Sequence, residues 1–298
     1  MIGPPNPYLA LTYLFARSTP RFWILLQNRV VSGLMFRRWG RVRRAVCRNL
    51  APVVGRSPED PVVLGLARRT FENYGVYLVD YLQIHRLRSR APRFLIPEQD
   101  GIQHFRDAMA PGRGAILVTP HLGNWELGGV SFALRNHPMY ALTLQDRVER
   151  LQDYRDWIRG TLNIQTVRID PDGYDTALKL AGLLRRKQVI AMLGDRWEGG
   201  KSVPVPFFGR RVRFPAGGTA VALVTGAPII PVFTVLQPNG RYRSWMEPPI
   251  HVERGRGADA KTLVTRATRE IAAVFEKTIA KYPDQWYHFF DYWDRYGV

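Results

Sequence analysis

Short apolar runs that alternate with helix-length segments constrain the fold of this 298-residue chain more than any other feature. Three runs, Ala115–Thr119, Val189–Leu193 and Ile229–Val235, are apolar at almost every position, which is the pattern of a strand buried on both faces. Weaker extended segments fall at 139–144 and 164–169. The helical segments expected around them are 125–136, 150–162, 175–187, 216–225 and 261–281. This alternation predicts an α/β fold in which helices flank a mostly parallel central sheet.

Residues 1–90 differ from the rest because they contain helical patterns without an apolar strand. Prolines at 92 and 97 end those patterns, and the strand rhythm begins afterwards. We therefore expect an N-terminal helical, membrane-associating segment over 1–90 and an α/β domain over 91–298, joined as one continuous globular unit. The single cysteine excludes an intrachain disulfide, and the six scattered histidines show no metal-ligand spacing. No metal or cofactor is expected.

The charge is strongly basic, with a formal net value of +18. Residues 1–50 contain nine arginines and no acidic residue. Such a segment attracts an anionic partner, namely a membrane surface, a nucleic acid or an acidic protein. No apolar run approaches the length of about 20 residues that a membrane span needs. No secretory signal is recognised either, so we expect a cytosolic chain that binds its anionic partner from that side.

The arginines near residue 40 follow a helical spacing. On a helical wheel one stripe contains Arg37, Arg41, Arg44 and Arg48. The opposite face contains Val31, Met35, Trp39, Val42 and Val46. An amphipathic helix of this kind can lie in a membrane interface, with its arginines on lipid phosphates. A surface helix that packs on the protein's own core fits the pattern equally well. Nucleic acid is less favoured, because no zinc-finger, zipper or RNP-type motif accompanies the charge.

The first buried strand leads directly into a turn that carries chemistry. His121 and Glu126 lie five residues apart, with Gly123 and Asn124 between them. Gly123 permits a sharp turn, and Asn124 is a suitable N-cap for the helix that follows. If Glu126 accepts a hydrogen bond from one ring nitrogen of His121, the other nitrogen becomes a general base for a substrate hydroxyl. Free amides of this turn could stabilise an oxyanion. The plain alternative is a structural histidine beside a helix-start acid.

The wider motif resembles a known family. Residues Thr119-Pro-His-Leu-Gly-Asn-Trp-Glu-Leu-Gly128 are similar to the His-x4-Asp/Glu block of the lysophospholipid acyltransferase superfamily. The resemblance is strongest to the branch that holds the bacterial lipid A late acyltransferases and the phosphatidylinositol mannoside acyltransferases. Four further blocks match in order, at residues 44–50, 205–209, 225–233 and 283–286. One departure is Asp195-Arg196, where the lipid A branch tends to have Asp-Gln.

The resemblance implies transfer of a fatty acyl group from a thioester, carried by acyl carrier protein or coenzyme A, to a hydroxyl of a lipid or glycolipid. It implies His121 as the base and Glu126 as its partner. The acyl donor is then a co-substrate, and the acceptor is a glycolipid or lysolipid. Because the spanning helix usual in the family is not recognised here, attachment to the cytoplasmic face of the inner membrane should be peripheral. The partners expected are anionic membrane lipids, with no nucleic acid.

Other residues are assigned within this interpretation. Asp195 and Arg196 could hold the acceptor's head group or phosphate, and Arg147 and Arg150 could clamp an acidic group of either substrate. Phe207 and Phe208 could line an acyl channel. Each assignment has a plain alternative, which is a solvated loop, a solvated face or core packing, respectively. A phosphate-binding loop at 194–202 is excluded, because its spacing exceeds the template by one residue and prolines prevent the helix it requires.

A different class of function is also open. A non-catalytic basic protein that binds anionic membranes or nucleic acid would account for the charge without using His121. The two classes differ in one test, because only the enzyme loses its function when His121 is replaced.

Overall fold

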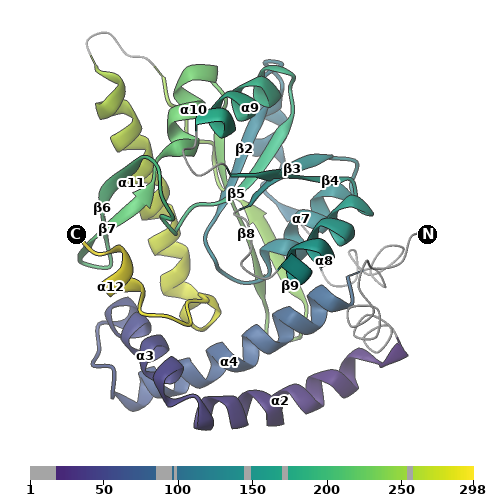
Figure 1. The fold of residues 1–298 in the computed structure, drawn as a ribbon, viewed down its shortest axis with the longest axis vertical. Helices are drawn as coiled ribbons and strands as arrows, with labels where there is room; N and C mark the ends of the chain where they lie inside the picture. The colour runs from purple at the N-terminus through teal and green to yellow at the C-terminus, as the bar shows by residue number, and fades with distance from the viewer. Residues whose placement is uncertain (1–17, 85–95, 97–98, 144–148, 170–173, 254–257) are drawn as a thin grey trace.

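A seven-stranded sheet forms the centre of the computed structural model, which describes residues 18–84, 96, 99–143, 149–169, 174–253 and 258–298 (Figure 1). The strand order is β1-β9-β8-β2-β5-β3-β4. The strands are β1 (Gln99–Asp100), β2 (Ala115–Thr119), β3 (Met139–Thr143), β4 (Ile164–Arg168), β5 (Val189–Leu193), β8 (Ile229–Leu236) and β9 (Tyr242–Met246). Only β8 and β9 pair antiparallel within this sheet. The predicted α/β fold with a mostly parallel sheet is therefore confirmed.

Helices cover both faces of the sheet (Figure 1). One face carries α9 (Tyr174–Arg185), α10 (Gly217–Thr225) and α11 (Ala260–Lys281), and the other carries α6 (Ile102–Met109), α7 (Trp125–Ala133) and α8 (Glu149–Gly160). A hydrophobic core lies on each face of the sheet, and successive residues of β2 point alternately into the two cores. Ile116 and Val118 pack into the first, while Ala115 and Leu117 pack into the second. Burial on both faces is the reason that this strand has no polar residue before Thr119.

A two-stranded hairpin, β6 (Ser202–Phe207) and β7 (Arg210–Pro215), lies outside the main sheet. Its two turn residues, Phe208 and Gly209, both have positive φ, at 50° and 72°, as a tight hairpin turn requires. The ring of Phe207 is fully buried, with its centroid 5.1 Å from that of Phe214. The hairpin lies between β5 and α10 along the chain.

The helices α2 (Arg21–Arg38), α3 (Gly40–Val54) and α4 (Pro61–Leu82) of the described N-terminal residues lie beneath the sheet. Figure 1 shows α2 lying along α4 on the outside of the molecule. Asp60 is the N-cap of α4, its carboxylate accepts from the N–H of Val62, and Pro61 is the first residue of the helix. None of the helices in the described part of the chain combines the length and the apolar character that crossing a bilayer demands.

The single amphipathic helix expected across Arg37 to Arg48 is not present. The helical conformation is interrupted at Trp39, which separates α2 from α3. The apolar face of α3 packs on the protein itself, with Val46 and Leu50 buried against α4. Val31 and Trp39, which were expected on that same face, are exposed. The alternative interpretation, a surface helix that packs on the protein's own core, is therefore correct for α3.

The C-terminal segment returns to the centre of the molecule. It contains a 3-10 turn, η2 (Pro283–Gln285), and the short helix α12 (Tyr292–Tyr296). Asn49 of α3 ties this segment down, because its side-chain amide donates to the carbonyls of His288 and Phe290 at 2.9 and 2.7 Å and accepts from the N–H of Tyr292. These three hydrogen bonds explain why an asparagine occupies an otherwise apolar helix face.

The turn after β2 is held by a glycine in the left-handed region. Gly123 has φ +62°, and a Cβ atom there would lie 2.1 Å from the carbonyl oxygen of Thr234 in β8. Its N–H donates to the carbonyl of Gln285 at 2.9 Å. A side chain at this position would push the turn away from both β8 and the C-terminal segment.

This close approach predicts a large cost for Gly123→Ala. We expect it to lower the free energy of unfolding by roughly 3 kcal/mol, from left-handed strain and overpacking together. Gly209→Ala is the matched control, because Gly209 has φ +72° and open space around the site of its Cβ; it should cost about 1 kcal/mol from strain alone. Urea unfolding measures both. Equal losses in the two variants would show that the contact with Thr234 is unimportant.

Candidate active site

The register of two neighbouring strands brings His121 and Asp195 together. Strands β2 and β5 are parallel, with Thr119 opposite Leu193, and the N–H of Gly194 donates to the carbonyl of Thr119 at 2.9 Å. His121 and Asp195 each lie two residues beyond this last pair. They therefore emerge side by side at the carboxyl edge of the sheet, the edge at which α/β proteins bind ligands.

The carboxylate of Asp195 is fully buried and is surrounded by four N–H donors. The main-chain N–H and the Nδ1 of His121 lie 3.0 and 2.6 Å from its two oxygens. The indole Nε1 of Trp286 and the Nε2 of His288 each lie 3.1 Å from Oδ2. Burial by itself raises the pKa of Asp195, but the bonds to His121 and His288 outweigh it and hold the pKa well below the usual value of 3.8. The carboxylate is therefore ionised.

An ionised carboxylate can only accept, so the Nδ1 of His121 must carry the proton. The other ring nitrogen, Nε2, then holds a lone pair. Burial lowers the pKa of His121 below 6.5; Asp195 raises it and the positive charge of Arg196 lowers it further. At neutral pH the ring is thus an oriented, uncharged base. Its side chain is 12% exposed and lines a large cavity.

Glu126 does not orient this ring. It lies in the first turn of α7 and pairs with Arg159 of α8, with Arg159 Nη2 2.7 Å from Glu126 Oε1. Both side chains are nearly buried and line the same cavity. The prediction that Glu126 accepts a hydrogen bond from one ring nitrogen of His121 is wrong, because Asp195 is the carboxylate that this ring contacts and Glu126 pairs with Arg159. Glu126 instead joins two helices and adds charge to the cavity wall.

Gly123 and Asn124 have the predicted turn and cap conformations, but they do not offer the predicted oxyanion donors. Asn124 caps α7, since its side chain accepts from the N–H of Leu127 at 3.0 Å. The main-chain N–H groups of Gly123 and Asn124 donate to the carbonyls of Gln285 and Thr234. These two amides are already used within the fold, so the predicted oxyanion hole at Gly123 and Asn124 is wrong.

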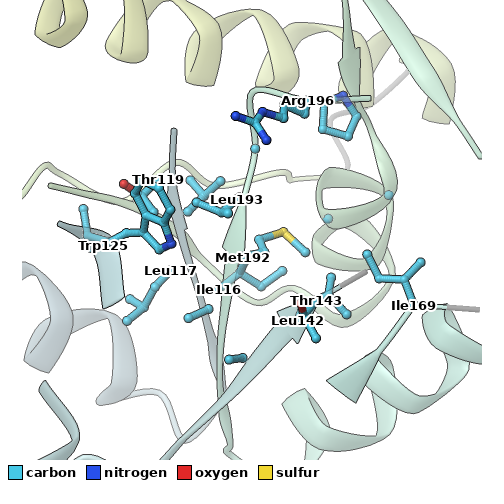
Figure 2. Close-up of a pocket in the computed structure, with 18 of the residues that line it drawn as sticks. Ile116, Leu117, Thr119, Trp125, Leu142, Thr143, Ile169, Met192, Leu193 and Arg196 are labelled. Carbon is cyan, nitrogen blue, oxygen red and sulfur yellow. The ribbon is translucent and has the colours of Figure 1, made fainter. Parts of the chain in front are cut away.

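The cavity beside His121 has a volume of about 1260 Å³, and its lining includes residues of β2, β3, β5 and β8. Figure 2 shows some of the residues that line it, among them the apolar side chains of Ile116, Met192, Leu142 and Ile169 from β2, β5, β3 and the residue after β4. Arg196 lies at the other end in the same view. Around His121 the lining is mixed, with Glu126, Arg159 and Arg196 among aromatic rings. One end of the cavity is therefore polar and reactive, and the other is apolar.

The remaining predicted site residues divide into three groups. Arg196 lines the cavity, next to Asp195, which acts inside the protein and not as a ligand for a head group. Arg147 lies outside the described residues, and for Arg150 the structure describes only the main chain, in α8. Neither Phe207 nor Phe208 is among the residues that line the large cavity. Phe207 is core and Phe208 packs against that core beside Trp286, so the predicted acyl channel is not formed by this pair.

The C-terminal segment completes the site, which the sequence alone did not indicate. The N–H of Tyr287 donates to the carbonyl of His121 at 2.8 Å, while Trp286 and His288 donate to Asp195. Four aromatic residues of this segment, Trp286, Tyr287, Tyr292 and Trp293, are buried in the protein. One available signal was missed. Two buried parallel strands that are followed at the same offset by His121 and Asp195 place those side chains together if the strands are neighbours.

Within the described residues, no group of three or more histidine, cysteine or acidic side chains is arranged to hold a metal ion. The chemistry that the side chains themselves offer is proton transfer at His121 Nε2, supported by the buried charge of Asp195.

Comparison with known proteins adds a family. Residues 8–295 match the model of the bacterial lipid A biosynthesis acyltransferases. A phosphatidylinositol mannoside acyltransferase of Mycolicibacterium smegmatis is 30% identical over 80% of this chain and 76% of its own length. Two phosphatidylinositol mannoside acyltransferases of Mycobacterium tuberculosis strains are 27% identical over 80% of this chain and 73% of their own length.

The geometry around His121 predicts its titration. By ¹⁵N NMR the ring should show the Nδ1–H form at neutral pH and titrate below 6.5. Asp195→Asn should lower the pKa of His121 further, because the neighbouring anion that stabilises the imidazolium is lost. Glu126→Gln, the matched control, should leave the titration almost unchanged. A larger shift in the Glu126 variant than in the Asp195 variant would contradict the assignment of Asp195 as the partner.

Proposed function

Because the chain belongs to the bacterial lipid A biosynthesis acyltransferase family and is an acyltransferase of lipid biosynthesis, we propose that it moves a fatty acyl group from a thioester to a hydroxyl of a membrane lipid or glycolipid. The observation that carries the proposal is the oriented, uncharged His121, whose unprotonated Nε2 belongs to a ring that lines a large cavity. Acyl carrier protein or coenzyme A carries the donor. The mannosides of phosphatidylinositol, named in the relatives, are the first acceptors to assay.

The proposed reaction has one base and two steps. His121 Nε2 takes the proton of the acceptor hydroxyl as its oxygen attacks the thioester carbonyl, and a tetrahedral intermediate forms. The carbon–sulfur bond then breaks, and the proton passes from the imidazolium to the departing thiolate. Asp195 stabilises the imidazolium while it exists. The cation of Arg196, held at the cavity wall, favours the negative charge that develops on the carbonyl oxygen.

The shape of the cavity supports an acyl donor. A fatty chain placed between Ile116, Met192 and Leu142 would leave water for an apolar wall, which stabilises it by about 0.8 kcal/mol per buried methylene. The thioester would then lie towards the polar end, near His121. The proposed acyl channel is therefore the space along the strands β2, β3 and β5.

The catalytic assignment predicts the effect of two substitutions. We expect His121→Ala to lower acyl transfer by about 10³-fold, within the range that general-base catalysis contributes, while the thermal unfolding temperature stays close to that of the wild type. Asp195→Asn should have a loss of similar size. The assay supplies purified protein with radiolabelled acyl donor on each carrier and with total membrane lipid.

A non-catalytic basic protein is the rival function, and the same assay separates the two. Equal labelling of lipid by the wild type and His121→Ala would overturn the proposed function. Absence of labelling with either carrier by the folded wild type would favour the rival.

We also propose that the protein works as a peripheral protein on the cytoplasmic face of the inner membrane and that α2 makes the contact. The outer side of α2 exposes large apolar side chains, namely Phe22, Trp23, Leu26, Val30, Val31, Leu34 and Met35, and Trp39 follows. Arg29, Arg37, Arg38, Arg41 and Arg44 are exposed beside them, and α2 and α3 contain no acidic residue. An apolar ridge flanked by cations suits an anionic bilayer. Arg48, predicted to join this contact, pairs with Asp291 at 3.3 Å.

Vesicle binding tests the α2 ridge. Val30→Asp with Leu34→Asp should weaken binding to phosphatidylglycerol-containing vesicles at least about ten-fold, because two apolar contacts are replaced by anions. Val62→Asp, a matched control at an exposed position of α4, should bind as the wild type does. Unchanged binding by the double variant would contradict the proposal. Self-association of the wild type in analytical ultracentrifugation that the double variant abolishes would assign the ridge to a second copy instead.

A further inference from the structure

His288 is a buried titratable group that the proposed reaction does not use. Only 1% of it is exposed, and both of its ring nitrogens make hydrogen bonds to charged side chains. Nε2 lies 3.1 Å from Oδ2 of Asp195, and Nδ1 lies 3.1 Å from Nε of Arg196. One neutral ring therefore connects the carboxylate behind the catalytic base to the cation on the cavity wall.

The tautomer of His288 follows from its partners. Arginine can only donate, so Nδ1 of His288 must accept and carries no proton. Nε2 then carries the proton and donates it to Asp195. Burial and the charge of Arg196 lower the pKa of His288 to about 3, so the ring stays neutral through the working pH range. A neutral ring here can bond an anion and a cation at once, which a protonated ring could not do.

Arg196 is fixed by three contacts. Beyond the bond to His288, its Nη2 donates to the carbonyl of Tyr287 at 2.7 Å, and its guanidinium lies 5.1 Å from the centroid of the Phe290 ring. All three partners belong to the C-terminal segment that also supplies Trp286 to Asp195. The C-terminal segment therefore fixes the position of the Arg196 guanidinium on the cavity wall.

We infer that His288 is a positioning residue that sets the basicity of His121, by donating to Asp195 and by holding Arg196 in place through its other nitrogen. The inference rests on the proposed function for its catalytic meaning, but its effect on the ring of His121 exists without substrate.

Both connections act on His121 in the same direction. A donor to Asp195 stabilises the carboxylate, which weakens its hold on the imidazolium form of His121. The cation of Arg196 also disfavours that form. The charged and titratable groups that face this cluster are Asp195, Arg196 and Glu198 around His121, and Arg196, Tyr292 and both histidines around Asp195. Loss of His288 therefore raises the pKa of His121.

The test compares two variants by ¹⁵N NMR titration of His121. His288→Phe keeps a ring but removes both hydrogen bonds, and it should raise the pKa of His121 by about half a unit to one unit. His288→Gln is the conservative variant, because its amide offers one donor and one acceptor, and it should return the pKa towards the wild-type value. The acidic limb of the pH profile of kcat/KM should move with the titration. A loss of packing alone would lower kcat at every pH and leave this limb in place.

The wild type gives a further measurement that needs no substitution. His288 should appear as a neutral ring protonated on Nε2 from pH 5 to pH 8. A protonated ring or the Nδ1–H form would overturn the inference, as would a folded His288→Phe variant whose His121 titrates like the wild type. If His288→Phe does not fold, the tautomer and the Gln variant decide. Acyl transfer by His121→Ala would refute the proposed function while leaving these NMR outcomes intact, so the two failures are distinguishable.

Discussion

The buried negative charge of Asp195 is the constraint on which the rest of the site depends. A carboxylate removed from water is unstable unless donors surround it, and this one has four N–H donors from two separate parts of the chain. The hydrogen bonds to this carboxylate fix the rotamer and tautomer of His121, the position of the turn after β2, and the path of the C-terminal segment. The buried carboxylate thus also joins the turn after β2 to the C-terminal segment.

The fold was largely predictable from the sequence, and the reason is the strength of the apolar pattern. Strands β2, β5 and β8 are buried on both faces, so their side chains leave a continuous signal. Strand β9 and helix α6 were not predicted. Strand β9 alternates buried residues with exposed or half-buried ones, and α6 is only eight residues long. The interruption of the helix at Trp39 was not predicted either. A helical wheel shows which residues share a face, but it does not show where a helix ends.

The site was predicted only as far as local sequence reaches. His121, the left-handed turn at Gly123 and the cap at Asn124 all follow from neighbouring residues. The partner of His121 did not follow, since Glu126 is near in sequence while Asp195 is near only after β5 has paired with β2. The acidic residue of the motif has a different task, as half of a nearly buried ion pair with Arg159. Phe207 and Phe208 were misassigned because an aromatic pair has the same sequence signature in a core as in a channel.

The return of the C-terminus to the turn after β2 has a consequence for how the protein becomes active during synthesis. Every strand of the central sheet is complete by Met246, yet Trp286 and His288 arrive about forty residues later and supply two of the contacts to Asp195. A nascent chain that has already formed its sheet therefore carries a histidine without its finished support. The hydrogen bonds around Asp195 are therefore complete only when the final segment packs over it, together with the residues of α11 and α12 that complete the core on the same face of the sheet.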